Sequence, residues 1–380
     1  MQRHSGNLIP RPASWSRTLY SLPGLWLLTL FAVVLVTACG GPSGSSATTS
    51  TAGCNLSLDE LNNIGSAPPE CLALLPDPQS TLNPRLFILG SETTQDGKLH
   101  IYAHAVDADD VPIQLLDFQT ATTVSVDGIV RLNNGQAENG GGVTVDAIAD
   151  GSPISLAFLT DYSASISDAN LDQIGAAYSQ ILSALPAGFE AQVLNFSSDT
   201  AVRQDWTQAL PALLDAVQFD PAFAPRNNTA LYDGIGNTLD RLVDHPEGGF
   251  GLADRCRPVR ILITHTDGLE NASFSYTKGQ LLAEIDSSRT IAIMLGTLTA
   301  NVSELEEFAG DRGAFVYAYD VNGIQAAVSG WAESFGDIVE FVIDAGIFNS
   351  DVPGAVQIAL GDLSVMVEAP YDQDCTPVVL

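Results

Sequence analysis

Between residues 154 and 335, short apolar runs of strand length alternate with segments whose apolar residues recur at helical spacing. This alternation predicts an α/β fold in which an open, doubly wound and mostly parallel sheet is covered by helices. In such a sheet, ligands bind beyond the carboxyl ends of the strands. The expected strands are 156–160, 191–196, 259–263, 291–295 and 314–319, and the expected helices are 171–185, 206–217 with an interruption near Pro211, 231–242, 280–285, 302–309 and 324–335.

The segments on either side of this region show the two-residue alternation of β-strands. In residues 99–105 the apolar side chains fall on one face, and His100, Tyr102 and His104 fall on the other. We interpret that second face as solvated, in preference to a metal site built on the two histidines. The pattern predicts a small β-sandwich in residues 54–150. Residues 337–380 carry similar strands, which we expect to complete the sandwich around an inserted domain of residues 151–336.

The first 53 residues have the composition of a targeting segment and a linker. Arg3, Arg11 and Arg17 precede an uncharged, mostly apolar stretch over 21–38, which is typical of a signal peptide. The stretch ends in Val-Thr-Ala-Cys-Gly, which resembles the lipobox of bacterial lipoproteins. The resemblance implies lipidation of Cys39, removal of residues 1–38 and a flexible tether over 39–53. The alternative is an uncleaved transmembrane anchor. Both interpretations place the remainder outside the cytoplasm in a bacterial cell envelope, and we expect anchoring at the outer membrane.

The chain is strongly acidic, with 45 Asp and Glu residues against 15 Lys and Arg and a formal net charge of -30. Such a charge disfavours nucleic acid and anionic lipid headgroups as partners, because binding to phosphate depends on clustered basic residues. It suits cations or a metal-bridged surface instead. Association with a membrane must therefore come from the lipid anchor rather than from electrostatic attraction.

The cysteines that remain after Cys39 form an even set in an oxidising compartment, which makes disulfides the expected state. They are Cys54, Cys71, Cys256 and Cys375. Three pairings are possible, and we favour Cys54 with Cys71 and Cys256 with Cys375 because the first two are close in sequence. A zinc site is the alternative, but the C-x-x-C spacing that favours one is absent from the sequence.

Three polar motifs fall at strand or helix ends inside the α/β region. The first expected strand runs into Asp161-Tyr-Ser163-Ala-Ser165, Thr229 opens the run Thr-Ala-Leu-Tyr-Asp before a helix, and a later strand ends in Thr-Asp267-Gly. All of these donors are hard oxygens, which suit Mg²⁺ or Mn²⁺ rather than zinc or copper. The simpler alternative is that the same residues only cap helices.

The order of these motifs along the βα alternation resembles the von Willebrand factor A (integrin I-like) domain family over residues 154–335. The resemblance implies a metal-ion-dependent adhesion site. Its hydroxyl oxygens would come from Ser163, Ser165 and Thr229, and its carboxylates, bound directly or through water, from Asp161 and Asp267. A mostly neutral inner shell leaves the ion electrophilic, so an acidic side chain of a protein partner can complete the coordination.

The sequence therefore predicts a metal-dependent adhesion or protein-binding lipoprotein without enzymatic activity. Two alternatives stay open: a metal-assisted hydrolase with His265 as its base, and an assembly factor that uses the fold without metal. The motifs of P-loop NTPases, zinc metalloproteases and α/β-hydrolases do not occur in the sequence. If the site switches between two states, the family resemblance implies movement of the helix expected at 324–335.

Overall fold

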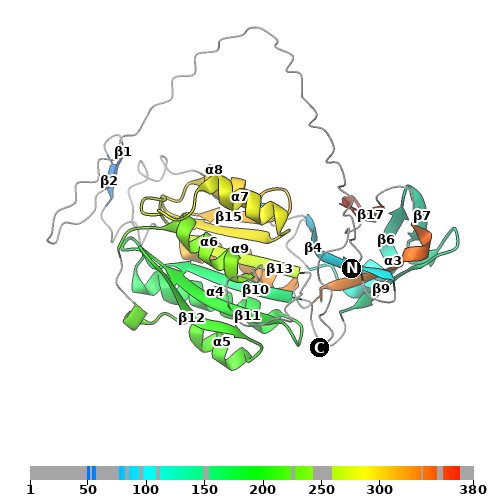
Figure 1. Ribbon diagram of the computed structural model, residues 1–380, viewed down its shortest axis with the longest axis horizontal. Helices are drawn as coiled ribbons and strands as arrows, with labels where there is room; N and C mark the ends of the chain where they lie inside the picture. Colours follow the sequence, from blue (N-terminus) through cyan, green and yellow to red (C-terminus); the bar gives the residue numbers. More distant parts are fainter. Residues whose placement is uncertain are drawn as a thin grey trace, which may run out of the picture. The chain divides into compact units, whose positions relative to one another are not determined.

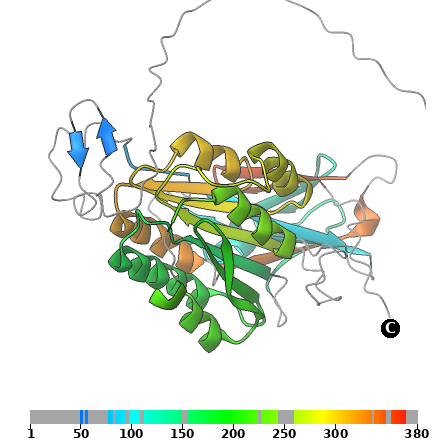
Figure 2. The same ribbon diagram turned by 60° about the vertical axis from the view of Figure 1, so that its left-hand side comes forward.

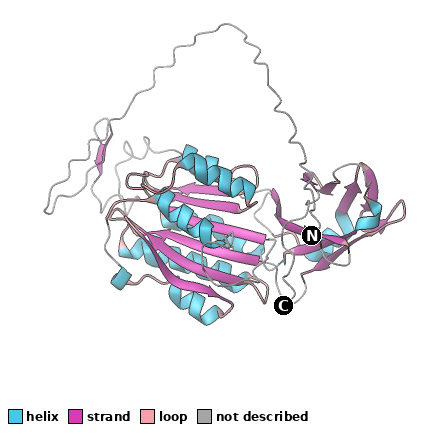
Figure 3. Ribbon diagram, in the orientation of Figure 1, coloured by secondary structure: helices cyan, strands magenta, loops and turns pink. Residues whose placement is uncertain are grey.

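The structure is a computed structural model of the 380-residue chain. It describes residues 49–51, 54–56, 77–81, 85–93, 97–107, 112–148, 154–223, 227–242, 259–334, 337–348 and 354–368. These residues form a seven-stranded sheet covered by helices, two antiparallel sheets of four and five strands, and a separate two-stranded antiparallel sheet (Figures 1 and 3).

The large sheet has the strand order β12-β11-β10-β13-β14-β15-β3. Its inner strands pair in parallel, whereas the edge strands β12 and β3 are antiparallel to their neighbours. Chain order reverses between β10 and β13, and the carboxyl ends of strands at such a point are where ligands bind in open α/β sheets. The strands are β10 (Ile154–Asp161), β11 (Glu190–Phe196), β12 (Thr200–Thr207), β13 (Val259–Thr266), β14 (Ile291–Thr297), β15 (Ala314–Ala318) and β3 (Gln79–Ser80).

Helices cover both faces of this sheet (Figure 2). One core contains Phe158 and Ile263 of the sheet. The helices that pack in it are α4 (Asp168–Ala184), α5 (Leu210–Ala216) and α9 (Val321–Ser334). A second core, with Leu159 and Leu262, contains α6 (Leu231–Leu242), α7 (Lys278–Ser287) and α8 (Val302–Ala309). Adjacent residues of one strand thus enter opposite cores. The predicted doubly wound α/β fold is confirmed.

The helix expected over 206–217 is wrong in its first part. Trp206 belongs to β12, and the helix α5 begins only at Leu210. Pro211 lies in the first turn of α5, where its missing N–H costs no helical hydrogen bond. The proline therefore starts the helix instead of interrupting it. A short 3₁₀ helix, η2 (Pro221–Phe223), follows.

Two antiparallel sheets form the additional β domain. Their strand orders are β4-β5-β16-β9 and β18-β17-β6-β7-β8, and they share a core with Ile101, Val124, Phe341 and Ile358. The strands are β4 (Arg85–Thr93), β5 (Lys98–Val106), β6 (Thr122–Val126), β7 (Ile129–Asn133), β8 (Gln136–Ala137), β9 (Val143–Ala147), β16 (Val339–Asp344), β17 (Ala355–Leu360) and β18 (Leu363–Glu368), with helix α3 (Leu115–Ala121) and the 3₁₀ helix η4 (Ala345–Ile347).

The last three strands come from the C-terminal part of the chain and join the earlier ones. Strand β16 lies between β5 and β9, and β17 pairs with β6. The helix-covered sheet is therefore inserted, in sequence, between the two halves of the β domain. In the sequence, residues 148–153 separate β9 from the inserted region, and residues 335–338 separate the inserted region from β16.

The second face of β5 is not solvated, so that prediction is wrong. Tyr102 and His104 are buried, and Tyr102 belongs to the same core as Phe158 of β10. His104 stacks on Phe87 with ring centroids 4.7 Å apart. Burial lowers the pKa of His104 to about 3, so its imidazole is neutral. A period-two pattern cannot show that a second domain covers the polar face of a sheet.

Part of the expected tether is a strand: β1 (Thr49–Thr51) pairs with β2 (Cys54–Leu56). Threonine is β-branched and favours strands, which opposes the flexibility that small polar residues suggest. Cys39, Cys71, Cys256, Cys375 and residues 1–38 lie outside the described residues, so lipidation, cleavage and disulfide pairing stay predictions. Among the described residues, no helix is long and apolar enough to cross a membrane.

We expect the buried His104 to make folding stability dependent on pH. Its pKa is lower in the folded chain than the ordinary value of 6.5, so protons bind preferentially to the unfolded chain below that pH. The contribution of His104 to the free energy of unfolding is fully present above pH 6.5. It is lost as the pH falls toward 3, by up to about 1.4 kcal/mol per pH unit. Urea unfolding at several pH values should show a shallower pH dependence for His104→Leu. An unchanged dependence would contradict the assignment.

Candidate metal centre

The predicted metal ligands lie at the carboxyl ends of the two neighbouring strands where chain order reverses. Asp161 is the last residue of β10, and Asp267 directly follows β13. Ser163 and Ser165 lie in the connection from β10 to α4, and Thr229 comes two residues before α6. Parallel pairing of β10 with β13 brings these segments to one edge of the sheet.

Hydrogen bonds connect four of these residues directly or through one neighbour. Ser163 Oγ lies 3.0 Å from Ser165 Oγ, and Ser165 Oγ donates to Asp267 Oδ1 at 2.7 Å. The Ser163 amide donates to Asp161 Oδ1 at 2.7 Å. Thr266 Oγ1 donates to the other oxygen of Asp161 at 2.8 Å. Both oxygens of Asp161 are therefore held in place, and the D-x-S-x-S segment is joined to the end of β13.

Thr229 reaches the same place through the loop after β13. Its amide donates to Asn271 Oδ1 at 3.0 Å, and the Asn271 amide donates to the carbonyl oxygen of Thr229 at 3.0 Å. A Cβ atom added to Gly268 would lie 3.2 Å from Thr229 Oγ1. The hydroxyl therefore lies beside the residue that follows Asp267. The structure thus brings all five sequence-predicted residues together.

The two carboxylates share an environment that is unfavourable for negative charge. Asp161 and Asp267 are 0% and 1% exposed. Burial raises the pKa of both, and the charge of Asp161 raises that of Asp267 further. Asp267 Oδ2 is buried without a hydrogen-bond partner within the described residues. A cation beside this oxygen would supply the missing partner and would favour the charged form of both groups.

The chemistry of the donors fits a hard divalent ion. The ring of candidate ligands contains three hydroxyls and two carboxylates, and hydroxyl and carboxylate oxygens suit Mg²⁺ and Mn²⁺. No cluster of three or more His, Cys, Asp or Glu side chains that could hold a metal occurs in the described part of the chain. Any metal in this place must therefore depend on the serine and threonine oxygens.

Two further acidic residues, which the sequence analysis did not single out, shape the loop beside the centre. Asp233 accepts hydrogen bonds from the amides of Phe274, Ser275 and Tyr276 at 2.9 to 3.1 Å. Glu270 accepts from Tyr232, Ala272 and Ser273 amides at 2.7 to 2.9 Å. These carboxylates are committed to backbone donors, so they position the loop. The sequence signal for Asp233 is an acidic residue in the first turn of a helix.

Two glycines let α6 pack closely against strand β11 and against the loop after β13. A Cβ atom on Gly234 would lie 2.9 Å from the ring of Phe196 in β11, and one on Gly236 would lie 2.4 Å from the ring of Tyr276. Larger residues here would push α6 away from the sheet. Because Thr229 lies two residues before this helix, the two glycines also help to place the Thr229 hydroxyl.

Comparison with known families agrees with this geometry. The family model of the von Willebrand factor type A domain matches residues 155–328. This part of the chain is a von Willebrand factor A (VWA) domain. The resemblance that the three motifs showed is therefore confirmed. VWA domains are generally protein-interaction modules and often bind a divalent metal at the site formed by these motifs.

Solved structures with a similar fold include proximal thread matrix protein 1 from the mussel byssus, with 17% identity and a TM-score of 0.39 over 53% of this chain and 50% of that one. Another structure of the byssus protein has a zinc-occupied metal site. BatB from Bacteroides thetaiotaomicron is 16% identical, with a TM-score of 0.34 over 46% of this chain and 95% of BatB. The chain thus spans about half the length of the byssus protein. No curated protein sequence matched the chain.

His265 does not face the VWA metal centre. It lies next to Thr266, but neighbouring residues of a strand point to opposite faces, and Thr266 contacts Asp161. The His265 imidazole is 0% exposed, and its Nε2 lies 3.3 Å from Thr297 Oγ1. Burial lowers its pKa to about 3. A neutral, fully enclosed imidazole on the other face is poorly placed to act as a base at this centre.

We expect Asp233→Ala to loosen the loop without removing a candidate metal ligand. The substitution leaves three backbone donors without their acceptor, and each costs about 1 kcal/mol or more when buried. The free energy of unfolding should fall by about 3 kcal/mol in urea titrations. The matched variant Asp240→Ala removes a carboxylate from the same helix. Within the described ranges this carboxylate accepts one hydrogen bond, from the Tyr276 hydroxyl at 2.5 Å, so its loss should cost less. Equal losses would contradict the role given to Asp233.

Proposed function

We propose that this protein is a metal-dependent adhesion or protein-binding module whose VWA domain holds Mg²⁺ or Mn²⁺. The supporting observation is the buried, unpartnered Asp267 Oδ2 beside the joined hydroxyls of Ser163 and Ser165. Asp161, Ser163, Ser165, Thr229 and Asp267 would hold the ion. When bound, the ion supplies a local positive charge with a position open to an external oxygen ligand.

We propose that the external ligand is an acidic side chain of a protein partner. With a net charge of -30, the chain repels anions at long range, so close recognition of a carboxylate needs a strong local cation. Two apolar side chains on the loop after β13, Leu269 and Phe274, are 48% and 83% exposed. Because the loop begins at Asp267, these side chains favour a protein surface as the partner over a free small anion.

A binding role is better supported than a hydrolytic one. The hydrolase alternative depends on His265 as base, and that imidazole is buried on the opposite face of the sheet from Thr266. The metal-free assembly alternative leaves Asp267 Oδ2 without a partner among the described residues, and it leaves the carboxylates of Asp161 and Asp267 buried together. A bound cation accounts for both features.

The metal is tested by calorimetric titration of Mg²⁺ and Mn²⁺ into the chain without residues 1–38, at moderate salt. We expect one saturable site, and we expect Asp161→Ala and Asp267→Ala each to weaken it by about tenfold or more. Zinc belongs in the same series, because its occupancy would change the proposed identity of the ion.

The matched control is Asp117→Ala, which removes one exposed carboxylate from α3 in the β domain. It should leave the affinity for the metal ion unchanged, because Asp117 is not a candidate ligand. A weaker affinity in this variant would indicate that ions bind only to the general negative charge of the chain. Binding that is unaffected by both site variants would refute the metal centre. The partner is then sought by selecting peptides on the metal-loaded protein. Selected peptides without an acidic residue, or binding that survives EDTA, would refute the carboxylate mechanism.

We propose that the protein is anchored through lipid on Cys39 at the bacterial outer membrane, outside the cytoplasm. The support is the basic and apolar character of residues 1–38 and the lipobox-like residues around Cys39. Growth with a labelled fatty acid should label the wild-type protein and leave Cys39→Ala unlabelled. An equally labelled variant, or an unlabelled wild type in a host that processes lipoproteins, would contradict the anchor.

A further inference from the structure

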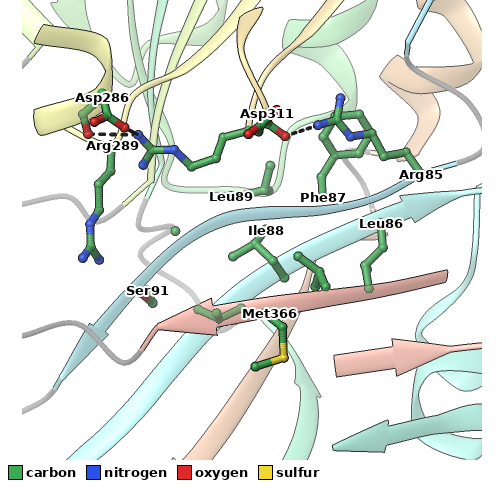
Figure 4. A pocket seen from close by; sticks show the side chains of 14 residues that line it. Arg85, Leu86, Phe87, Ile88, Leu89, Ser91, Asp286, Arg289, Asp311 and Met366 are labelled. Atoms are coloured by element: carbon green, nitrogen blue, oxygen red, sulfur yellow. Dashed lines mark hydrogen bonds and ion pairs between the residues drawn. The ribbon is translucent and has the colours of Figure 1, made fainter. Parts of the chain in front are cut away.

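A pocket of about 430 Å³ lies at the opposite edge of the VWA sheet from the metal centre (Figure 4). It is lined by β4, by β18, and by two short segments around Asp286–Arg289 and Asp311–Arg312. These segments directly precede β14 and β15, so they belong to the amino ends of the parallel strands. The pocket therefore lies between the VWA domain and the β domain, and it shares no residue with the metal centre.

One wall of the pocket carries three arginines and two aspartates in a strongly acidic chain. Arg85 donates to the carbonyl oxygens of Gly313 and Asp311 and lies over the ring of Phe87. Arg312 pairs with Asp286 at 3.1 Å. Both guanidinium groups are thereby fixed by neighbours. With Arg289, they give the pocket three of the 15 basic residues of the chain.

Arg289 differs from these two because its guanidinium has no hydrogen-bond or ion-pair partner in the described part of the chain. Among the described residues, no group forms a hydrogen bond or ion pair with the Arg289 guanidinium, whereas Arg85, Arg260 and Arg312 each have such a partner. Figure 4 shows the side chain pointing away from Asp286, toward the end of the pocket where Ser91 lies. The group is thus available to an anion that enters the pocket.

Arg289 also occupies a backbone conformation that disfavours it. It follows Ser288, the C-cap of α7, and its φ is +54°. Glycine is the usual residue at such a position, because a Cβ atom is strained there. Arginine at this position therefore has a conformational cost. Because the described residues provide no structural partner for its side chain, this cost favours a binding role for Arg289.

The other wall is apolar and is formed by two sheet edges. Within the described chain, β4 pairs only with β5, and β18 only with β17. Leu86 and Ile88 of β4 and Val365 and Val367 of β18 belong to or pack against the core of the β domain. An edge strand presents unpaired N–H and C=O groups along one side. This pocket thus combines an open strand edge, apolar side chains and an unpartnered cation.

We propose that the pocket binds an extended acidic peptide of a partner protein, which adds as a strand along the free edge of β4. Successive side chains of a strand point to opposite sides. Acidic residues of the peptide would face Arg289, and the alternate residues would be apolar and face Ile88 and Val365. Main-chain hydrogen bonds supply affinity in this mode, and the side-chain walls supply specificity.

The test is fluorescence anisotropy with a labelled six-residue peptide in which glutamate alternates with valine, titrated with the full chain in mild detergent. EDTA is present throughout, so that a metal bound at the VWA site cannot hold the peptide. We expect saturable binding that is about tenfold weaker when glutamine replaces glutamate. A peptide with N-methyl groups on alternate amides of its pairing edge should also bind about tenfold more weakly, because it cannot form the ladder.

Variants at Arg289 separate recognition from folding. Arg289→Glu should abolish measurable binding, and Arg289→Gly should weaken it about tenfold while raising the melting temperature, because glycine tolerates the positive φ. A loss of binding in a more heat-stable protein cannot come from misfolding. The control Lys278→Glu, at a partly exposed site on α7 whose ammonium pairs with Glu307, should leave binding unchanged.

Three results would overturn the proposal. The first is no saturable binding of the glutamate-valine peptide, and the second is binding that Arg289→Gly does not weaken. The third is equal competition by free N-acetylglutamate or by the N-methylated peptide, which would identify a pocket for small anions without strand addition.

Discussion

The arrangement of this VWA domain depends on two carboxylates that are buried together at the carboxyl ends of β10 and β13. Asp161 and Asp267 are almost fully enclosed, and hydrogen bonds from Ser163, Thr266 and Ser165 satisfy three of their four oxygens. The fourth oxygen is the unsatisfied one. Burying two like charges is costly without a compensating positive charge. The site therefore has the electrostatics of a cation-binding centre before any ligand is considered.

The surrounding elements serve to hold these carboxylates and their hydroxyl neighbours in place. Asp233 fixes three consecutive amides of the loop after β13, and Glu270 fixes three more backbone donors. Gly234 and Gly236 let α6 approach the sheet, so that Thr229 can reach the same edge. Acidic residues close to the centre thus have two separate uses. Asp161 and Asp267 are candidate ligands of a cation, whereas Asp233 and Glu270 accept hydrogen bonds from the backbone.

The sequence was most informative where one local pattern carried the signal. Buried strand runs and helical periods predicted the α/β fold, and oxygen-bearing residues at strand ends predicted the site. The interpretation of His104 was wrong because the period-two pattern gives the two faces of β5 but not what covers them. Trp206 was assigned to a helix because an apolar run next to Pro211 is compatible with a helix or a strand. The edge strand β12 contains no fully buried residue, so it lacks the buried apolar run by which the other strands were predicted. The roles of Asp233 and Glu270 depend on backbone contacts between distant segments, which spacing alone does not show.

The insertion of the VWA domain in the β domain constrains how the two can act on each other. Helix α9 follows β15, and only residues 335–338 separate it from β16. Strand β16 is not at an edge, because it pairs with β5 on one side and β9 on the other. Ile324 and Val328 of α9 are fully buried in the VWA core, while Val339 and Phe341 of β16 are fully buried in the β domain. A shift of α9 along its axis would therefore either pull on a doubly paired strand or be absorbed by four connecting residues. The same short connection that joins the domains thus limits how far this helix can move without disturbing the β domain.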